Sequence, residues 1–198
     1  MYRQTILLST LVLICAGTAL AQRPGPEFWR KVGCEPFEPR TKLEALEDRH
    51  NSVIIKGFTR ITTVEVRGVR IDAIDMRDTG RTLAPNGAKG IVVVLREGGE
   101  RPEDNRAFVD YDEIDSLLNA IDLISRIDET ATKLPGFEAR YKTSGDLEIS
   151  VFRQTRSGAA VIVSTGICDR ATQTLSLDDL AKIKAMIQEA KARLDELR

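Results

Sequence analysis

Apolar residues recur at spacings of three and four in two long stretches of the chain. The first stretch places them at Ile114, Leu117, Leu118, Ile121, Ile124 and Ile127. The second places them at Leu180, Ile183, Ile187, Ala190, Leu194 and Leu197. This spacing puts the apolar side chains on one face of an α-helix. The pattern therefore predicts two long amphipathic helices, each with a buried stripe.

Polar residues mark the starts of these helices and of a shorter one that ends near Arg49. Three pairs have the spacing of a capping box. In this motif each of the two side chains accepts a hydrogen bond from the backbone N–H of the other residue. The pairs are Thr41 with Glu44, Asp110 with Glu113, and Ser176 with Asp179. Carboxylates in a first helical turn also complement the helix dipole. We therefore interpret the acidic clusters at 110–115 and 178–179 as caps, and not as catalytic pairs or cation sites.

The segments between the helices alternate apolar and polar residues or form short apolar runs, both typical of β-strands. Strands are predicted at 53–55, 61–66, 69–75, 91–95, 107–109, 137–141, 147–153, 159–164 and 172–175. Gly57 is expected to end the first strand, and Gly68 to form a turn or bulge. Beyond Gly68, Val69, Ile71 and Ala73 fall on one face of a strand, so Arg70 and Asp72 are expected in solvent. Segment 91–95 is the most hydrophobic part of the chain after the N-terminal region, so it is expected to be a central strand.

The two halves of the strand-rich region repeat one order of elements. Aligning Asp112 with Asp178 brings Ile114 opposite Leu180, and both helices follow several strands. The pattern predicts an α+β domain at 41–198, with antiparallel β-meanders each followed by a packed amphipathic helix. Candidate repeats are 52–130 and 136–198. Chance helical periodicity is the alternative to a true internal duplication.

The first 21 residues have the pattern of a signal peptide. Arg3 supplies a positive charge, Ile6 to Cys15 form an apolar region, and Ala19 and Ala21 provide a small-x-small cleavage site. The apolar run is shorter than the roughly 20 residues that a membrane span needs, although a retained anchor is the alternative. We expect cleavage near Ala21, export to the periplasm or the extracellular space, and no transmembrane segment in the mature form.

The segment after the cleavage site, residues 22–40, contains four prolines among polar and aromatic residues: Pro24, Pro26, Pro36 and Pro39. This density of prolines argues against a regular element and predicts an extended leader.

Charge and composition do not favour a nucleic-acid partner. Removing Arg3 with the signal segment reduces the 29 basic residues to 28, against 30 acidic ones, so the formal charge of the mature chain is −2. Such a chain has no long-range attraction to nucleic acid. Aromatic residues make up only 5% of the chain, so stacking platforms for bases are scarce.

The chain lacks the residue patterns of common catalytic and metal sites. His50 is the only histidine, and a lone histidine makes a poor metal site or catalytic triad. The string at 87–90, Gly-Ala-Lys-Gly, does not have the spacing of a phosphate-binding loop. We therefore predict no catalytic, cofactor-binding or metal-binding residues, and we expect a protein that is not an enzyme and has no cofactor.

Cys34 and Cys168 are the two thiols of the mature chain. In an oxidising compartment such a pair is a candidate disulfide, which could stabilise the fold by about 4–5 kcal/mol through the long loop it closes. Two unpaired thiols are the alternative, because the sequence does not supply the geometry.

Four segments resemble a family of secreted bacterial proteins with no assigned activity. They are 42–44 (Lys-Leu-Glu), 54–58 (Ile-Ile-Lys-Gly-Phe), 110–117 (Asp-Tyr-Asp-Glu-Ile-Asp-Ser-Leu) and 176–180 (Ser-Leu-Asp-Asp-Leu). The resemblance covers most of the mature chain, is weakest at 67–90, and implies no site residues. Strands followed by a capped helix are also similar in outline to single-stranded-DNA-binding coactivator domains, but the charge and the export signal argue against that role.

These patterns together predict an exported, non-catalytic protein that binds another protein or a cell-envelope component through a sheet face or edge. The alternative is a small-ligand-binding module with a pocket between sheet and helices. An exposed apolar patch would favour the first hypothesis. An enclosed cavity with converging polar groups would favour the second.

Overall fold

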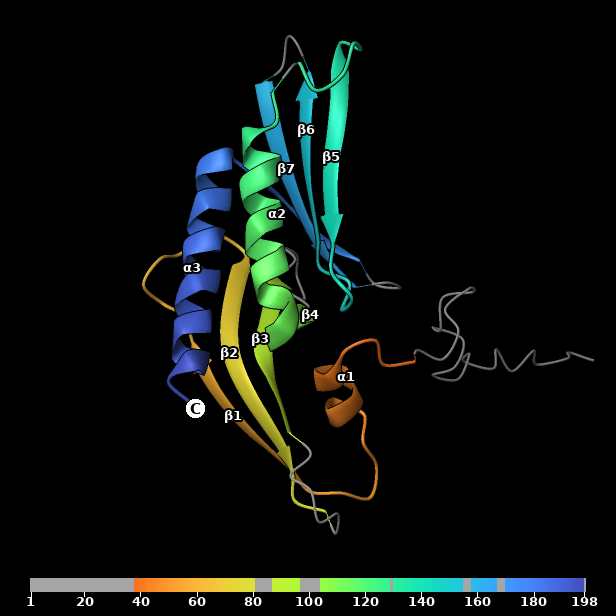
Figure 1. The fold of residues 1–198 in the computed structure, drawn as a ribbon, viewed down its shortest axis with the longest axis vertical. Helices are drawn as coiled ribbons and strands as arrows, with labels where there is room; N and C mark the ends of the chain where they lie inside the picture. Colours follow the sequence, from red (N-terminus) through yellow and green to blue (C-terminus); the bar gives the residue numbers. More distant parts are fainter. Residues whose placement is uncertain are drawn as a thin grey trace, which may run out of the picture. The chain divides into compact units, whose positions relative to one another are not determined.

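A computed structural model describes residues 38–80, 87–96, 104–128, 130–154, 158–166 and 170–197. The chain runs twice through four strands and a helix (Figure 1). The first pass contains β1 (Ile54–Arg60), β2 (Val69–Asp78), β3 (Gly87–Arg96), β4 (Asp104–Asp110) and α2 (Ile114–Arg126), preceded by the short α1 (Lys42–Glu47). The second contains β5 (Gly136–Lys142), β6 (Glu148–Gln154), β7 (Gly158–Thr165), β8 (Ala171–Leu175) and α3 (Leu177–Asp195). The predicted α+β fold of antiparallel meanders, each followed by an amphipathic helix, is confirmed.

Each meander forms its own four-stranded sheet, with the strands in chain order. In the first sheet Ile71 pairs with Val93, and in the second Val151 pairs with Val161. All neighbouring strands within a sheet are antiparallel. Because side chains alternate along a strand, each of these registers fixes which residues share a face.

One hydrophobic cluster joins both sheets and both long helices. Its fully buried members include Ile71 of β2, Ile91 of β3, Leu117 of α2, Ile149 of β6 and Leu180 of α3. Helices α2 and α3 run side by side, and the Lys184 ammonium bonds the Asp122 carboxylate across them at 2.6 Å (Figure 1). The predicted apolar stripes therefore pack against a shared core.

A second cluster covers the opposite face of the first sheet. Leu43 and Leu46 of α1 pack there with apolar side chains of the sheet, which are Ile54, Ile74, Met76, Ala88, Val92, Val94 and Phe108. Strands β2 and β3 therefore have both faces covered along part of their length. This burial on two sides explains the continuous apolar run at 91–95.

The predictions for the start of the first sheet are partly wrong. β1 continues through Gly57, which pairs with Asp75, whereas the segment 61–66 is irregular. Ile61 and Val66 are buried all the same, because the loop folds its apolar side chains into the core. The turn predicted at Gly68 is present, with φ of 75°, a conformation that glycine adopts at little cost.

Two of the three predicted capping boxes are confirmed. Thr41 with Glu44 and Ser176 with Asp179 form both reciprocal bonds at the starts of α1 and α3. The prediction for Asp110 is wrong, because its side chain makes no cap bond to its own helix. A 3-10 turn, η2 (Tyr111–Glu113), separates it from α2.

Two predictions of exposure are also wrong. Leu197 was expected in the stripe of α3, but the helix ends at Asp195 and Leu197 is 55% exposed. Asp72 was expected in solvent, but it is 9% exposed because two arginines cover it on the strand surface.

Candidate binding surfaces of the first sheet

Several predicted features lie outside the described residues. They are the signal segment 1–21, residues 22–37 of the leader, and both cysteines, Cys34 and Cys168. In the described part of the chain, no group of three or more His, Cys, Asp or Glu side chains is placed to hold a metal ion. No helix among the described ranges is long and apolar enough to cross a membrane.

The acidic cluster at 110–115 connects separate elements. Asp112 pairs with Lys42 at 2.6 Å, Asp115 with Lys191 at 3.0 Å, and Glu113 accepts a hydrogen bond from the backbone N–H of Ser144 at 2.9 Å. The hydrogen bond from Lys42 holds the pKa of the Asp112 carboxyl below its ordinary value. A general acid needs the opposite shift at neutral pH, so the position of Asp112 suits an ion pair.

Strand β1 forms one edge of the first sheet. The backbone N–H of Thr79 bonds the carbonyl of Val53, and the N–H of Ile61 bonds the carbonyl of Ile71, each at 3.0 Å. Hydrogen-bonded pairs alternate along an antiparallel ladder, so the odd-numbered residues of β1 bond to β2. The even-numbered residues, Ile54, Lys56, Phe58 and Arg60, then point their N–H and C=O groups outward. No strand within the described ranges pairs with that side.

The side chains of this edge are unusually apolar for an exposed strand. Val53, Ile55 and Phe58 are 68%, 57% and 69% exposed. Sheet edges are commonly protected by charged side chains, and β1 contains Lys56 and Arg60. The Lys56 side chain forms an ion pair with Glu47 of α1, in which the ammonium lies 3.1 Å from the carboxylate. Within the described ranges, β1 therefore presents apolar side chains beside outward backbone groups.

A hollow adjoins this edge where β1 passes the C-terminal end of α3. Its volume is about 490 Å³, and its lining includes Gly57, Phe58, Leu194 and Leu197. The exposed side chain of Leu197 borders it, with Arg193 and Glu196 nearby, whereas Phe58, the cross-strand partner of Ile74, has its side chain on the α1 face of the sheet. The hollow can accept an apolar side chain of a segment lying along β1.

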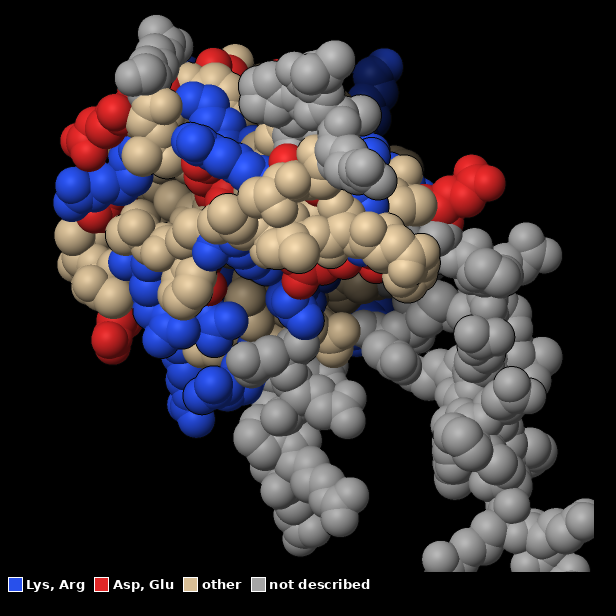
Figure 2. All heavy atoms as spheres, turned by 90° about the horizontal axis from the view of Figure 1, so that it is seen from below, with Lys and Arg blue, Asp and Glu red and all other residues tan. Residues whose placement is uncertain are grey.

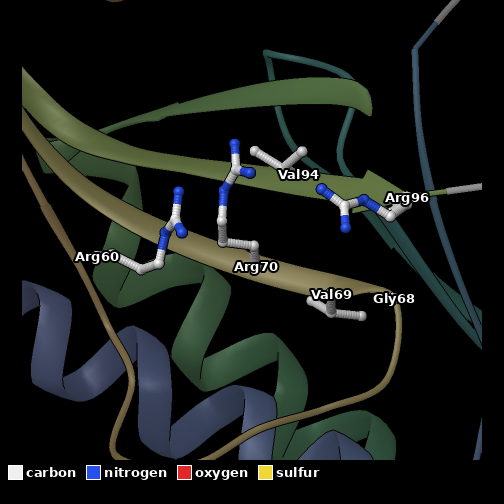
Figure 3. A pocket seen from close by; sticks show the side chains of 6 residues that line it. All are labelled: Arg60, Gly68, Val69, Arg70, Val94 and Arg96. Carbon is white, nitrogen blue, oxygen red and sulfur yellow. The ribbon is translucent and has the colours of Figure 1, made fainter. Parts of the chain in front are cut away.

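A second hollow lies on the face of the first sheet that α1 covers in part. It is lined by Arg60, Gly68, Val69, Arg70, Val94 and Arg96 and has a volume of about 210 Å³. Figure 3 shows the three guanidinium groups on one side of the strands, with Val94 between Arg70 and Arg96. Asp72, the cross-strand partner of Arg60, accepts a hydrogen bond from the Nε–H of Arg60 at 3.4 Å and of Arg70 at 3.1 Å.

Backbone contacts fix the rim of this arginine-lined hollow. The N–H of Arg96 bonds the carbonyl of Gly68 at 2.9 Å, and the side-chain amide of Gln173 donates to the carbonyl of Arg96 at 2.7 Å. A Cβ atom at Gly68 would lie 2.9 Å from the Gln173 side chain. Strand β8 therefore holds the end of β3 in place through Gln173.

Charge on the rest of the described surface is mixed. In the view from below, Lys and Arg side chains lie among Asp and Glu side chains across the visible face (Figure 2). Many of these charges form ion pairs, as Lys42 does with Asp112. At the arginine-lined hollow, Arg60 and Arg70 both pair with the Asp72 carboxylate.

Sequence reasoning did not identify either surface. The apolar run at 53–55 predicted a strand, but its position at the edge depends on the order of the sheet. The arginines come from three strands, so only cross-strand pairing brings them together. Comparison of the chain with protein-family models, with curated proteins and with solved structures finds no match.

Proposed function

We propose that this protein binds an extended segment of a partner protein, which adds to the open side of β1 as a further strand. The observation that carries the proposal is the apolar edge, where Ile55 and Phe58 are more than half exposed beside outward backbone groups. In strand addition the backbone bonds supply affinity, and pockets for alternate side chains supply specificity. The edge and its adjoining hollow offer both.

The charges of β1 indicate the chemistry of the segment. The strand contains Lys56 and Arg60 and no acidic residue, and the Arg60 side chain is 55% exposed. Opposite charges on facing strand positions attract, whereas like charges repel. We therefore expect the bound segment to pair an apolar residue with Phe58 and an acidic residue with Arg60. A second copy of β1 would bring four basic side chains and no carboxylate together, so it fits less well.

The N-terminal segment supports export, so we propose that the partner is an exported protein or a protein of the cell envelope. The role is binding, without catalysis. The alternative, a small-ligand site between sheet and helices, receives less support. That space contains packed core side chains such as Ile71, Leu117 and Leu180.

Substitutions at Phe58 test the proposal, because they distinguish the contribution of its side chain to binding from that of its backbone N–H. Phe58→Ser removes the apolar group, and Phe58→Pro also removes the outward N–H without breaking a bond to β2. Gly57 precedes it, and glycine tolerates the restriction that proline imposes on the residue before it. The matched control is Leu123→Ser, because Leu123 on α2 is 66% exposed.

The measurement is the amount of partner retained from an envelope extract by each immobilised variant. We expect Leu123→Ser to match the wild type, Phe58→Ser to retain about tenfold less, and Phe58→Pro to retain none. Unfolding temperatures verify that the variants are folded. Undiminished retention by folded Phe58→Pro would contradict strand addition, and a dimer of the purified wild type that Phe58→Pro abolishes would assign the edge to a second copy.

Amide hydrogen exchange provides a readout at single residues. In the free protein, the amides of Lys56, Phe58 and Arg60 should exchange faster than those of Gly57 and Thr59. Addition of the captured partner should slow the exchange of the Lys56, Phe58 and Arg60 amides and leave the exchange of the Gly57 and Thr59 amides unchanged. Equal protection of both sets would indicate general stabilisation in place of a new strand.

A further inference from the structure

We infer that two copies of this protein associate through β5, by antiparallel pairing of the outer edge of this strand with the same edge of the second copy. The inference concerns the second sheet and does not depend on the partner proposed for β1. β5 is the outermost strand of that sheet (Figure 1), and no strand within the described ranges pairs with its outer side.

The first support is the direction of the backbone groups of β5. Where β5 and β6 meet in their hairpin, the N–H of Thr143 bonds the carbonyl of Leu147, which lies opposite, at 2.9 Å. Hydrogen-bonded pairs alternate along an antiparallel ladder, so the odd-numbered residues of β5 bond to β6. The even-numbered residues then direct their N–H and C=O groups outward. They are Gly136, Glu138, Arg140 and Lys142.

The second support is the match of these charges with themselves. Two copies related by a two-fold axis can pair so that Glu138 lies opposite Arg140 of the second copy, and Arg140 opposite its Glu138. Both residues are exposed, and opposite charges on facing strand positions attract. In the same register Lys142, which forms an ion pair with Asp146 at 2.6 Å, faces Gly136 of the second copy and meets no like charge.

The third support is the apolar face of the strand. The same register places Phe137 opposite Tyr141 of the second copy and Ala139 opposite Ala139. These are positions without hydrogen bonds between the two copies, where facing side chains approach most closely. Facing aromatic residues stabilise a sheet. Ala139 and Tyr141 pack against the main core, so this pairing continues that core from one copy to the other.

Other registers of β5 on itself fit less well. The nearest ones that keep outward backbone groups opposite each other place either Arg140 opposite Arg140 or Glu138 opposite Glu138. Like charges directly opposite each other are destabilising. A slip by a single residue instead turns outward groups of one copy toward inward groups of the other, so the hydrogen bonds are lost. The charges of β5 therefore specify one pairing.

The comparison with β1 explains why the second copy binds at β5. β1 contains Lys56 and Arg60 and no acidic residue, so pairing β1 with itself brings only like charges together. β5 contains charges of both signs at neighbouring outward positions. A self-complementary interface requires both signs on one surface patch.

Sedimentation velocity of the purified protein over a concentration series tests the inference. We expect a monomer–dimer equilibrium in the wild type. Arg140→Glu and Glu138→Arg each convert both charge pairs into like-charge pairs, so each should raise the dissociation constant about tenfold or more. Because these substitutions change the net charge in opposite directions, a general charge effect would not weaken both dimers.

Two further variants make the test specific. Glu138→Arg and Arg140→Glu combined in one chain restore opposite charges in the same register, so the dissociation constant should return to near the wild-type value. The matched control is Arg67→Glu, an exposed arginine in the loop before β2. It changes the net charge as Arg140→Glu does and should leave the dissociation constant unchanged.

Amide hydrogen exchange locates the contact. At concentrations where the dimer predominates, the amides of Glu138, Arg140 and Lys142 should exchange more slowly than in the monomer. The amides of Phe137 and Ala139 already bond to β6 and should not change. A monomeric wild type in which the amides of Glu138, Arg140 and Lys142 still exchange slowly would assign the edge to another segment of the same chain, and would overturn the inference.

The remaining contrary outcomes are equally distinct. The inference is overturned if the wild type stays monomeric up to its solubility limit, if folded Arg140→Glu dimerises as tightly as the wild type, or if the double variant stays as weak as the single ones. A dimer that Phe58→Pro abolishes and Arg140→Glu leaves intact would place the second copy on β1 and also overturn it. Unfolding temperatures verify that each variant is folded. Glu138→Arg also removes the bond that its carboxylate accepts from the Ser150 hydroxyl at 3.1 Å, so Arg140→Glu is the deciding single variant.

Discussion

The Asp110 carboxylate accepts a hydrogen bond from the backbone N–H of Lys42 at 2.8 Å, although 68 residues separate them. It also accepts one from the N–H of Leu43 at 3.2 Å. The last residue of β4 thus satisfies donors at the start of α1 that a helix leaves without internal partners. This contact fixes α1 on the sheet face, with Leu43 fully buried beneath it.

Replacing Asp110 tests this connection. Asp110→Ala leaves two backbone donors of α1 without their acceptor, so the free energy of unfolding should fall by about 1–3 kcal/mol. Asp112→Ala is the control, because the Asp112 side chain is 68% exposed and its ion pair with Lys42 lies in solvent. This control substitution should lower the free energy of unfolding, measured by urea denaturation, by less than about 1 kcal/mol. Equal losses would show that Asp110 acts only as a surface charge.

Gly145 lies where the β5–β6 hairpin meets β4. It forms an isolated bridge with Phe108, and a Cβ atom there would lie 1.9 Å from the Phe108 carbonyl oxygen. Gly145→Ala should therefore destabilise the protein by about 3 kcal/mol or more. At Gly57 the nearest atom to an added Cβ is the Asp75 carbonyl oxygen, at 3.7 Å. Gly57→Ala should change the unfolding temperature little, and a comparable loss in both variants would contradict the close approach.

Acid should destabilise the protein through Asp78. A hydrogen bond from the Ser52 hydroxyl, then one from the Gly80 backbone and the charge of Arg49, hold the pKa of the Asp78 carboxyl below its ordinary value. Because folding lowers this pKa, its contribution to stability is complete above the unfolded pKa, at about 4, and is lost as the pH falls through the folded value. Thermal unfolding from neutral pH to about pH 2 should show a smaller decline in Asp78→Asn than in the wild type. An unchanged decline would show that other carboxyls account for it.

The two faces of α2 should respond differently to truncation. Leu117 is fully buried in the main core, so Leu117→Ala should lower the free energy of unfolding by about 2–5 kcal/mol. Leu123 is 66% exposed on the same helix, and Leu123→Ala should change stability by less than about 0.5 kcal/mol. Chemical denaturation of the two variants measures the difference. A large effect at Leu123 would mean that this side of α2 is covered in solution.

The sequence by itself determined the elements whose signals are local. The stripe from Leu180 to Leu194 and the reciprocal bonds of Ser176 with Asp179 arise within one helix, so both were predictable. Alternation likewise identified the first two strands of the second sheet, and a short apolar run identified the third. Phe137–Tyr141 lies within β5, for example. Residues a few positions apart carry these signals, and local propensity suffices to read them.

Only the tertiary structure decided which residues of different elements come into contact. Asp110 has the spacing of a cap for its own helix, yet it bonds Lys42, because α1 packs on the sheet face beside β4. Strand register places Arg60, Arg70 and Arg96 around one hollow, and strand order leaves β1 at an edge of the sheet. Strand order and cross-strand pairing join residues that are distant along the chain, so local patterns do not encode them. For that physical reason the two candidate binding surfaces could be identified only from the fold, although some of the strands that form them could be predicted from the sequence.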